Sequence, residues 1–196
     1  MRHNYVKFWN WFHTQEQYIF DELEHHPDEI AEEIAKYLER IDPDLVFDIP
    51  FDISEGTREF IISADGDKNL FSVVQDFVKS APPFERWKVV GLRPRTNQLD
   101  QAIDIDGLYL EYEDIFVVVK NKFFPLDVDV YIKGYQIDDN RYIHGYFLLL
   151  DTLVGEYNAV TCFGNTMIHS YEEAPEDITR FVTLREVTDY LLQKKN

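Results

Sequence analysis

The sequence predicts an α+β fold in which helices pack on a mixed or antiparallel sheet. Apolar residues recur every three or four positions between Thr14 and Arg40, which is the helical period, and they alternate with polar residues over Leu45–Ile53, which is the strand period. In addition, the two halves of the chain, about 1–96 and 97–196, repeat in outline the order strand, strand, helix, strand. We therefore expect a single domain over residues 1–196, with two packed ββαβ-like halves as the alternative description.

Two helices are expected near the amino terminus, over Thr14–His25 and Pro27–Arg40. Pro27 separates them because proline fits the first turn of a helix and breaks a helix interior. Thr14 is the expected cap of the first helix, since Gln17 follows three residues later as in a capping box. The residues expected to face the sheet are Tyr18, Ile19 and Leu23 on the first helix and Ile30, Ile34 and Leu38 on the second. The aromatic residues expected to clamp the helix start are Phe8, Trp9, Trp11 and Phe12.

The rest of the first half follows from short-range patterns. Leu45–Ile53 is expected as a strand, and Pro50 within it indicates a sheet edge. A turn leads into a second strand over Arg58–Ala64. Helical spacing predicts a helix over Lys68–Ser80, which is ended by two prolines, and Arg86–Leu92 is the third expected strand.

The second half is read in the same way. The expected strands are Leu108–Tyr112, Ile115–Val119, Leu126–Ile132, Arg141–Leu149 and Asn158–Phe163. A short helix is expected over Leu150–Glu156, between the last two of these strands. A closing helix over Thr183–Leu192 is indicated by apolar residues at three- and four-residue spacing.

Charge narrows the classes of partner. The chain carries 37 acidic and 19 basic residues, a formal net charge of −18. Such a surface repels the phosphates of nucleic acids and of anionic membranes, so neither is an expected partner. A basic protein partner is compatible with this charge, and solubility alone is the other explanation of it.

The cysteine content and the terminus bear on location. Cys162 is the single cysteine, so no intramolecular disulfide is available, which is typical of a reducing compartment such as the cytoplasm. The amino terminus lacks the apolar core of a signal peptide, and no apolar run approaches the roughly 20 residues that span a bilayer. We therefore expect a cytoplasmic protein.

No motif indicates a metal or a cofactor. Glu22 and His25 have the spacing of a carboxylate and an imidazole on one helix face, but a di-iron bundle needs two such motifs and further glutamates. A solvated turn is the simpler interpretation of His25 and His26. Cys162 lies in an apolar run and is expected to be buried and inert rather than a nucleophile. Phosphate-binding, dinucleotide-binding and nucleophile-elbow motifs are absent from the sequence.

A basic stretch is the first candidate site. Residues 86–95 hold four basic and no acidic side chains in a strongly acidic chain. These candidates for binding an anion are Arg86, Lys88, Arg93 and Arg95. Arginine suits that role because its planar fork of donors matches carboxylates and phosphates. The alternative is ion pairing with the protein's own carboxylates.

Carboxylates at expected strand exits are the second candidate site. Asp65, Asp151 and Glu156 each stand near a junction between an expected strand and helix. Sites in sheet proteins often use such ends, so these are the candidate acid and base groups. The alternative is structural, with Asp65 and Asp151 as helix caps and Gly155 as a glycine-permitted helix end.

Several motifs taken together resemble an uncharacterised bacterial protein family. They are Phe8-Trp9-x-Trp11-Phe12, Arg58-Glu59-Phe60-Ile61-Ile62-Ser63-Ala64-Asp65-Gly66, Ala81-Pro82, Trp87-Lys88, Arg93-Pro94-Arg95 and Leu148-Leu149-Leu150-Asp151-Thr152-Leu153-Val154-Gly155-Glu156-Tyr157. The resemblance spans about residues 8–163. It implies a bacterial cytoplasmic origin and brings no activity, cofactor or catalytic residue.

The leading functional hypothesis is a noncatalytic binding or regulatory module. Its specific version is an immunity-like protein that presents an acidic face to a basic partner, with Asp127, Asp129, Asp138 and Asp139 as the carboxylates to neutralise. The alternative is a small hydrolase-type enzyme that uses the strand-end carboxylates. A pocket that joins those carboxylates favours the enzyme, and a flat acidic and aromatic surface favours the binder.

Overall fold

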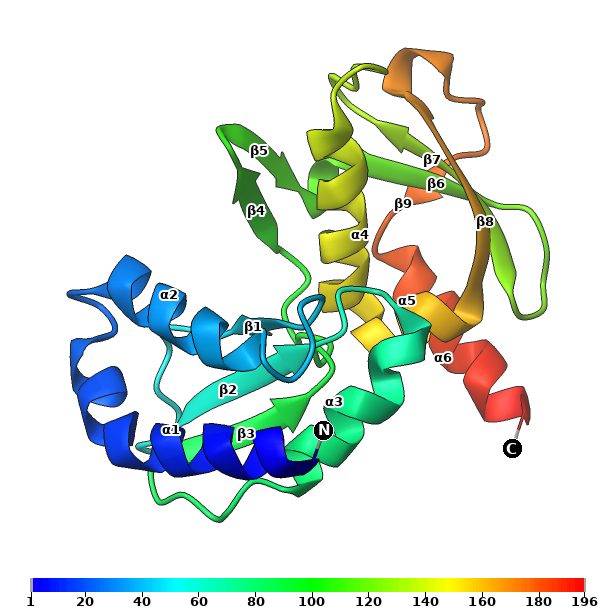
Figure 1. Cartoon of the computed structure of the whole chain (residues 1–196). Coiled ribbons are helices and arrows are strands. Elements are labelled where there is room, and N and C mark those ends of the chain that lie inside the picture. The colour runs from blue at the N-terminus through cyan, green and yellow to red at the C-terminus, as the bar shows by residue number, and fades with distance from the viewer. Residues whose placement is uncertain (1, 196) are drawn as a thin grey trace. The chain divides into compact units, whose positions relative to one another are not determined.

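Residues 2–195 are described in this computed structural model, and they form an α+β fold of helices with mixed and antiparallel sheets (Figure 1). The predicted fold class is confirmed. The chain divides into two units, Met1–Arg93 and Pro94–Asn196, and each is described by itself. Within residues 2–195, no helix is both long and apolar enough to span a membrane.

The first unit contains a three-stranded sheet in the order β1-β2-β3. β1 (Val46–Asp48) pairs antiparallel with β2 (Arg58–Ser63), and β2 pairs parallel with β3 (Trp87–Gly91). The short turn η1 (Lys68–Leu70) and helix α3 (Phe71–Lys79) connect the two parallel strands. The segment from β1 to β3 is therefore a ββαβ unit, as predicted.

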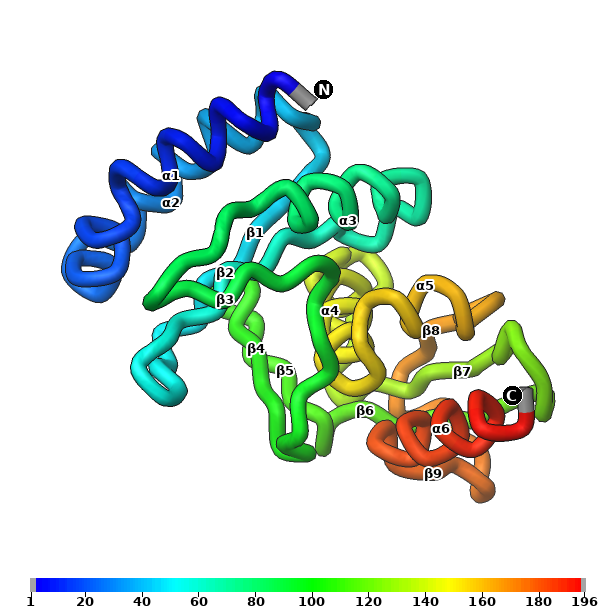
Figure 2. The backbone as a smooth tube through the Cα atoms, turned by 90° about the horizontal axis from the view of Figure 1, so that it is seen from below, coloured from blue at the N-terminus to red at the C-terminus, as the bar shows by residue number. Residues whose placement is uncertain are grey.

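Aromatic side chains of α1 (Arg2–Glu22) form much of the core of this unit. The Phe12 ring stacks 5.0 Å from Phe60 of β2, and Trp9 stacks 4.6 Å from Phe77 of α3. Helix α2 (Pro27–Leu38) runs beside α1 in the opposite direction (Figures 1 and 2), where Trp11 stacks on Tyr37 at 4.1 Å. Such aromatic pairs contribute roughly 0.5–1.5 kcal/mol each beyond their burial.

The start of α1 differs from the prediction. The helix begins twelve residues before Thr14, whose hydroxyl donates to the Trp11 carbonyl at 2.7 Å and caps nothing. Residues 2–22 contain neither proline nor glycine, and Phe8 and Phe12 lie one helical turn apart, so the aromatic motif is itself helical. Tyr18, expected to face the sheet, is 46% exposed.

The first expected strand is also shorter than predicted. Only Val46–Asp48 of Leu45–Ile53 pairs with a neighbour. Phe51 and Ile53 are 57% and 50% exposed, so the alternation there does not mark a half-buried strand. Pro50 lacks the N–H that would continue the ladder.

The second unit is built around a four-stranded sheet in the order β8-β7-β6-β9. β6 (Ile115–Val119) pairs antiparallel with β7 (Leu126–Ile132) and with β9 (Thr179–Arg180), whereas β7 pairs parallel with β8 (Phe163–Ser170). Helices α4 (Asn140–Val154) and α5 (Glu156–Cys162) connect β7 to β8 (Figure 2). The order β6-β7-helix-β8 thus repeats the pairing pattern of β1 to β3.

The core of the second unit lies on one face of this sheet. Inward side chains of β6 and β7, such as Val117 and Val130, pack against Tyr146 of α4 and Leu184 of α6 (Thr183–Lys195). The hairpin of β4 (Ala102–Ile105) and β5 (Leu108–Glu111) packs on α4, and the short turns η2 (Tyr112–Asp114) and η3 (Tyr171–Glu173) complete the unit.

Two predictions for the second half are wrong. Arg141–Leu149 is part of helix α4 and not a strand, and Asn158–Phe163 is mostly helix α5. The large apolar residues that α4 buries recur at helical spacing, among them Tyr142, Tyr146, Leu149, Leu150 and Leu153. A continuous apolar run is compatible with a buried strand as well as with a buried helix. The length of 15 residues favours the helix, because strands are usually shorter.

Candidate functional site

The four residues of the basic stretch are all engaged in ion pairs. Arg86 contacts Asp21 at 2.7 Å, and its guanidinium lies 3.6 Å from the centre of the Phe20 ring. Lys88 contacts Glu59 at 2.7 Å, and Arg93 contacts Asp48 at 2.7 Å and Asp65 at 3.3 Å. Arg95 contacts Asp189 at 2.7 and 3.0 Å in the second unit. These contacts are the internal ion pairs expected as the alternative, and anion binding at the four residues stays a prediction.

Asp65 lies in the turn after β2. Its φ is +48° and that of Gly66 is +82°, a pair of left-handed residues that Asp and Gly tolerate well. The side chain of Asp65 is 49% exposed and contacts Arg93, and its backbone N–H donates to the Ser63 hydroxyl at 2.9 Å. Asp67, and not Asp65, caps the following helical turn by accepting from the Asn69 N–H at 2.8 Å.

Asp151 and Glu156 flank the corner between α4 and α5. Gly155 makes this corner with φ +86°, which glycine adopts without steric cost. Asp151 is 7% exposed and Glu156 is 0% exposed. The structure therefore brings two of the three candidate carboxylates to one corner and buries both there, whereas Asp65 belongs to the other unit.

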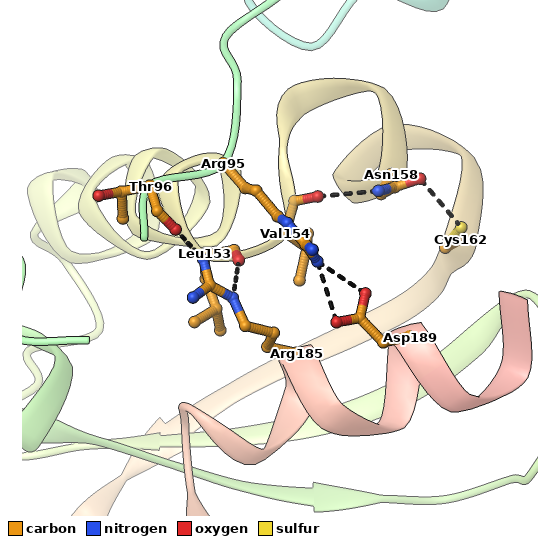
Figure 3. A network of polar contacts seen from close by, with 8 residues as sticks. All are labelled: Arg95, Thr96, Leu153, Val154, Asn158, Cys162, Arg185 and Asp189. Carbon is orange, nitrogen blue, oxygen red and sulfur yellow. Dashed lines mark hydrogen bonds and ion pairs between the residues drawn. The ribbon is translucent and has the colours of Figure 1, made fainter. Parts of the chain in front are cut away.

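Polar contacts at this corner satisfy the last carbonyl groups of α4 (Figure 3). The Asp151 and Thr152 carbonyls accept from the N–H groups of Gly155 and Thr96, each at 2.8 Å. The Leu153 carbonyl accepts from Arg185 Nε, and the Val154 carbonyl from Asn158 Nδ2, each at 2.8 Å. Since the carbonyls that end a helix lack partners within the helix, this network is a helix terminus with its polar groups satisfied.

The arginines of Figure 3 tie three segments together. Arg185 of α6 donates to the Thr96 carbonyl as well as to Leu153, and Arg95 pairs with Asp189 of the same helix. The Arg185 cation also stands at the carboxyl end of α4, where the helix dipole favours positive charge. These contacts join α6, the end of α4 and residues 95–96. Arg95, Arg185 and Asp189 therefore have a structural role.

Cys162 is buried and forms no disulfide, but it ends α5 instead of lying in a strand. Its thiol lies 3.9 Å from Asn158 Oδ1. We expect a thiol reagent to label native Cys162 at least about 100-fold more slowly than the unfolded chain, because labelling requires local opening. A colorimetric disulfide-exchange assay with and without denaturant measures both rates, and equal rates contradict the assignment.

The described residues contain no group of three or more His, Cys, Asp and Glu side chains placed to hold a metal ion. His25 and His26 are exposed in the turn between α1 and α2. His26 lies 3.9 Å from Glu22 and 3.8 Å from Glu29, so it contacts acidic side chains of both helices.

A strong concentration of exposed acidic residues lies on α2 and on Glu39, which directly follows the helix. We call Asp28, Glu29, Glu32, Glu33 and Glu39 the α2 acidic face. All five are exposed, whereas Ile30, Ile34 and Leu38 form the buried stripe of the helix. Lys36 lies 3.8 Å from Glu32, the one ion pair with a lysine or arginine that this face makes within the described residues. A rigid helix therefore presents several carboxylates to solvent.

This concentration was visible in the sequence, where residues 16–44 hold eleven acidic side chains and two basic ones. The four carboxylates predicted from the sequence to face a basic partner are less accessible to one, because most of them have partners within the protein. Asp129 contacts Lys120 at 2.6 Å, and Asp127 accepts from the Asn165 N–H at 2.8 Å. Asp139 caps α4 and pairs with Arg141, whose hydrogen bonds lower the pKa of the Asp139 carboxyl. Of the four, Asp138 is exposed, and the other three are partly buried.

Comparison with known proteins finds no match for this chain: no family model, no curated protein and no solved structure is significantly similar to it.

Proposed function

We propose that this protein is a noncatalytic binding module of the bacterial cytoplasm that captures a basic protein partner through the α2 acidic face. The observation that carries the proposal is the presence of four exposed carboxylates on α2, with Glu39 directly after it, whereas the opposite face of the helix is anchored in the core. Clustered exposed charge of one sign accelerates association with a partner of opposite sign. An immunity-like role, in which the acidic face blocks a basic target, is the specific form of this proposal.

The contacts of the other candidate groups support binding over catalysis. The basic stretch is paired internally, and Asp151 and Glu156 are buried beside a helix terminus whose polar groups are satisfied. A hydrolase needs an acid, a base and a substrate position within reach of one another. The hydrolase alternative therefore gains no support from the geometry of these carboxylates.

The test compares two variants with the same change of charge. In one, Glu29, Glu32, Glu33 and Glu39 become glutamine; in the other, Glu172, Glu173 and Glu176 become glutamine and Asp177 becomes asparagine. Proteins retained from a bacterial lysate at about 50 mM salt are identified by mass spectrometry, and association of the purified partner is timed. We expect a basic partner whose association slows roughly tenfold with the α2 variant and by less than about twofold with the control.

Salt gives a second readout of the same proposal. Exposed charges are screened over about 8 Å at physiological ionic strength, so the association rate of the native protein should fall steeply as salt rises. Retention of no basic protein at low salt, or equal slowing by the two variants, would overturn capture by the α2 acidic face.

A further inference from the structure

Arg180 of β9 stands apart from the other arginines of the chain. Among the arginine side chains that the structure describes, it is the one that has no ion pair, hydrogen bond or ring contact. The chain holds 37 acidic residues, so an exposed guanidinium without a carboxylate is unusual here. Its direct cross-strand neighbour is Phe116 of β6, so both side chains project from the same face of the sheet.

Arg180 lines a pocket of about 270 Å³ in the second unit. Tyr112 and Ile115, which are 2% and 1% exposed, form part of its apolar lining together with Phe116 and Val182. The Tyr112 hydroxyl is already engaged with Thr152 Oγ1 at 2.8 Å, and burial raises its pKa, so it contributes no charge. The charged side chains of the pocket are therefore at Lys133, Arg180 and Glu113.

The second cation of the pocket is held in place by its own neighbours. Lys133 Nζ donates to the Glu113 carbonyl at 2.8 Å and lies 3.4 Å from Asp114 Oδ1. It also stands 5.6 Å from the centre of the Phe116 ring. Asp114 offsets much of this charge, which leaves Arg180 as the cation available to a ligand.

We infer that this pocket binds a small monocarboxylate with an apolar body, whose carboxylate pairs with Arg180 and whose body packs against Phe116, Leu99 and Val182. The planar guanidinium fork matches the two oxygens of a carboxylate, and a site with few polar groups and an apolar lining fixes the orientation of the ligand. The Glu113 side chain, which also lines the pocket, disfavours ligands with a second negative charge.

The size of the pocket sets the scale of the ligand and of its affinity. Its volume lies just below the usual range for drug-sized ligands, so about ten to twelve non-hydrogen atoms are expected to fit. A ligand of that size, with about 0.4 kcal/mol per atom, has a Kd on the order of 1 mM.

The experiment is an NMR titration of the full chain with 3-phenylpropionate, with its neutral isostere 3-phenylpropanamide and with inorganic phosphate. We expect 3-phenylpropionate to bind with a Kd of about 1 mM and to shift the methyl signals of Leu99 and Val182, which line the pocket. Arg180→Ala should weaken binding at least about tenfold. Arg180→Lys, which keeps the charge and loses the fork, should be intermediate. Lys122→Ala is the matched control, because it removes one exposed cation of the same unit that does not line this pocket.

Arg180 is an exposed residue of a two-residue edge strand, so its replacement should leave the circular dichroism spectrum and Tm of the protein unchanged. Three results would overturn the inference. They are absence of binding at about 10 mM 3-phenylpropionate, equal affinity for the amide or for phosphate, and equal effects of Arg180→Ala and Lys122→Ala. None of these results bears on capture through α2, because the two tests change different residues and use different ligands.

Discussion

Replacing Glu24 with alanine is expected to lower the free energy of unfolding by about 3 kcal/mol, because it leaves a buried guanidinium without its carboxylate. Arg58 of β2 is 3% exposed, and its Nη2 lies 2.6 Å from Glu24 Oε1. Nη1 donates to the Phe51 carbonyl, and Nε has no hydrogen-bond partner. The Phe20 ring, 5.1 Å from the guanidinium carbon, adds a cation–π contact.

The decisive measurement compares the loss of stability when Arg58 is replaced with the loss when Glu24 is replaced. Glu24 is 56% exposed, so removing Arg58 leaves a carboxylate that water solvates, whereas removing Glu24 leaves a cation that water does not reach. Arg58→Met, which fills the site with apolar atoms, should therefore cost less than Glu24→Ala, and Glu24→Ala should cost almost nothing in the Arg58→Met background.

Urea unfolding of the four proteins of this cycle gives the coupling energy. Glu33→Ala is the control, since Glu33 is an exposed glutamate of α2 without a described ion pair, and its change should stay within about 0.5 kcal/mol. If Glu24→Ala and Glu33→Ala cost the same, the ion pair with Arg58 contributes no stability.

Local periodicity was sufficient to predict the first ββαβ unit. β2, α3 and β3 lie within one residue or a few of the ranges expected from the sequence, because each has a clear two-residue or helical period and a turn at its end. α4 was mistaken for a strand because its apolar residues occur in a nearly continuous run. The packing of α4 against the sheet of the second unit involves residues distant in sequence, so a short stretch of sequence cannot predict it.

The outcome for the basic stretch has a similar cause. The charge reversal over residues 86–95 was visible, but the partners of Arg86, Arg93 and Arg95 lie 65, 45 and 94 residues away in sequence. No spacing rule connects such positions, so pairing and anion binding could not be distinguished. For the same reason, the sequence gives no sign that Arg180, which is surrounded by acidic neighbours in the chain, has no partner.

The motifs from which a family resemblance is predicted also have structural explanations. Phe8, Trp9 and Phe12 fill the core of the first unit, and Asp65-Gly66 forms the left-handed turn after β2. The segment 148–157 holds the end of α4, the Gly155 corner and two buried carboxylates. Residues that are needed for folding can thus produce a recognisable pattern without catalysis.

Glu156 provides the sharpest test of that interpretation. Its side chain is 0% exposed at the first position of α5. If Glu156 is structural, Glu156→Gln should lower the free energy of unfolding by about 2 kcal/mol, because a fully buried carboxyl group depends on polar contacts that an amide reproduces poorly. Glu156→Ala should cost about 3 kcal/mol, since it also leaves a cavity.

If Glu156 were a catalytic acid, Glu156→Gln would be expected to raise the free energy of unfolding. Catalytic groups are often kept at a cost in stability, so their replacement commonly stabilises a protein while abolishing its activity. Asp65→Asn is the matched control, because the residue is half-exposed and asparagine tolerates its φ of +48°; its effect should remain within about 0.5 kcal/mol. Urea unfolding at neutral pH measures all three variants. A gain of stability in Glu156→Gln would revive the hydrolase alternative, whereas a loss of the expected size assigns Glu156 to the framework that holds α4 and α5 together.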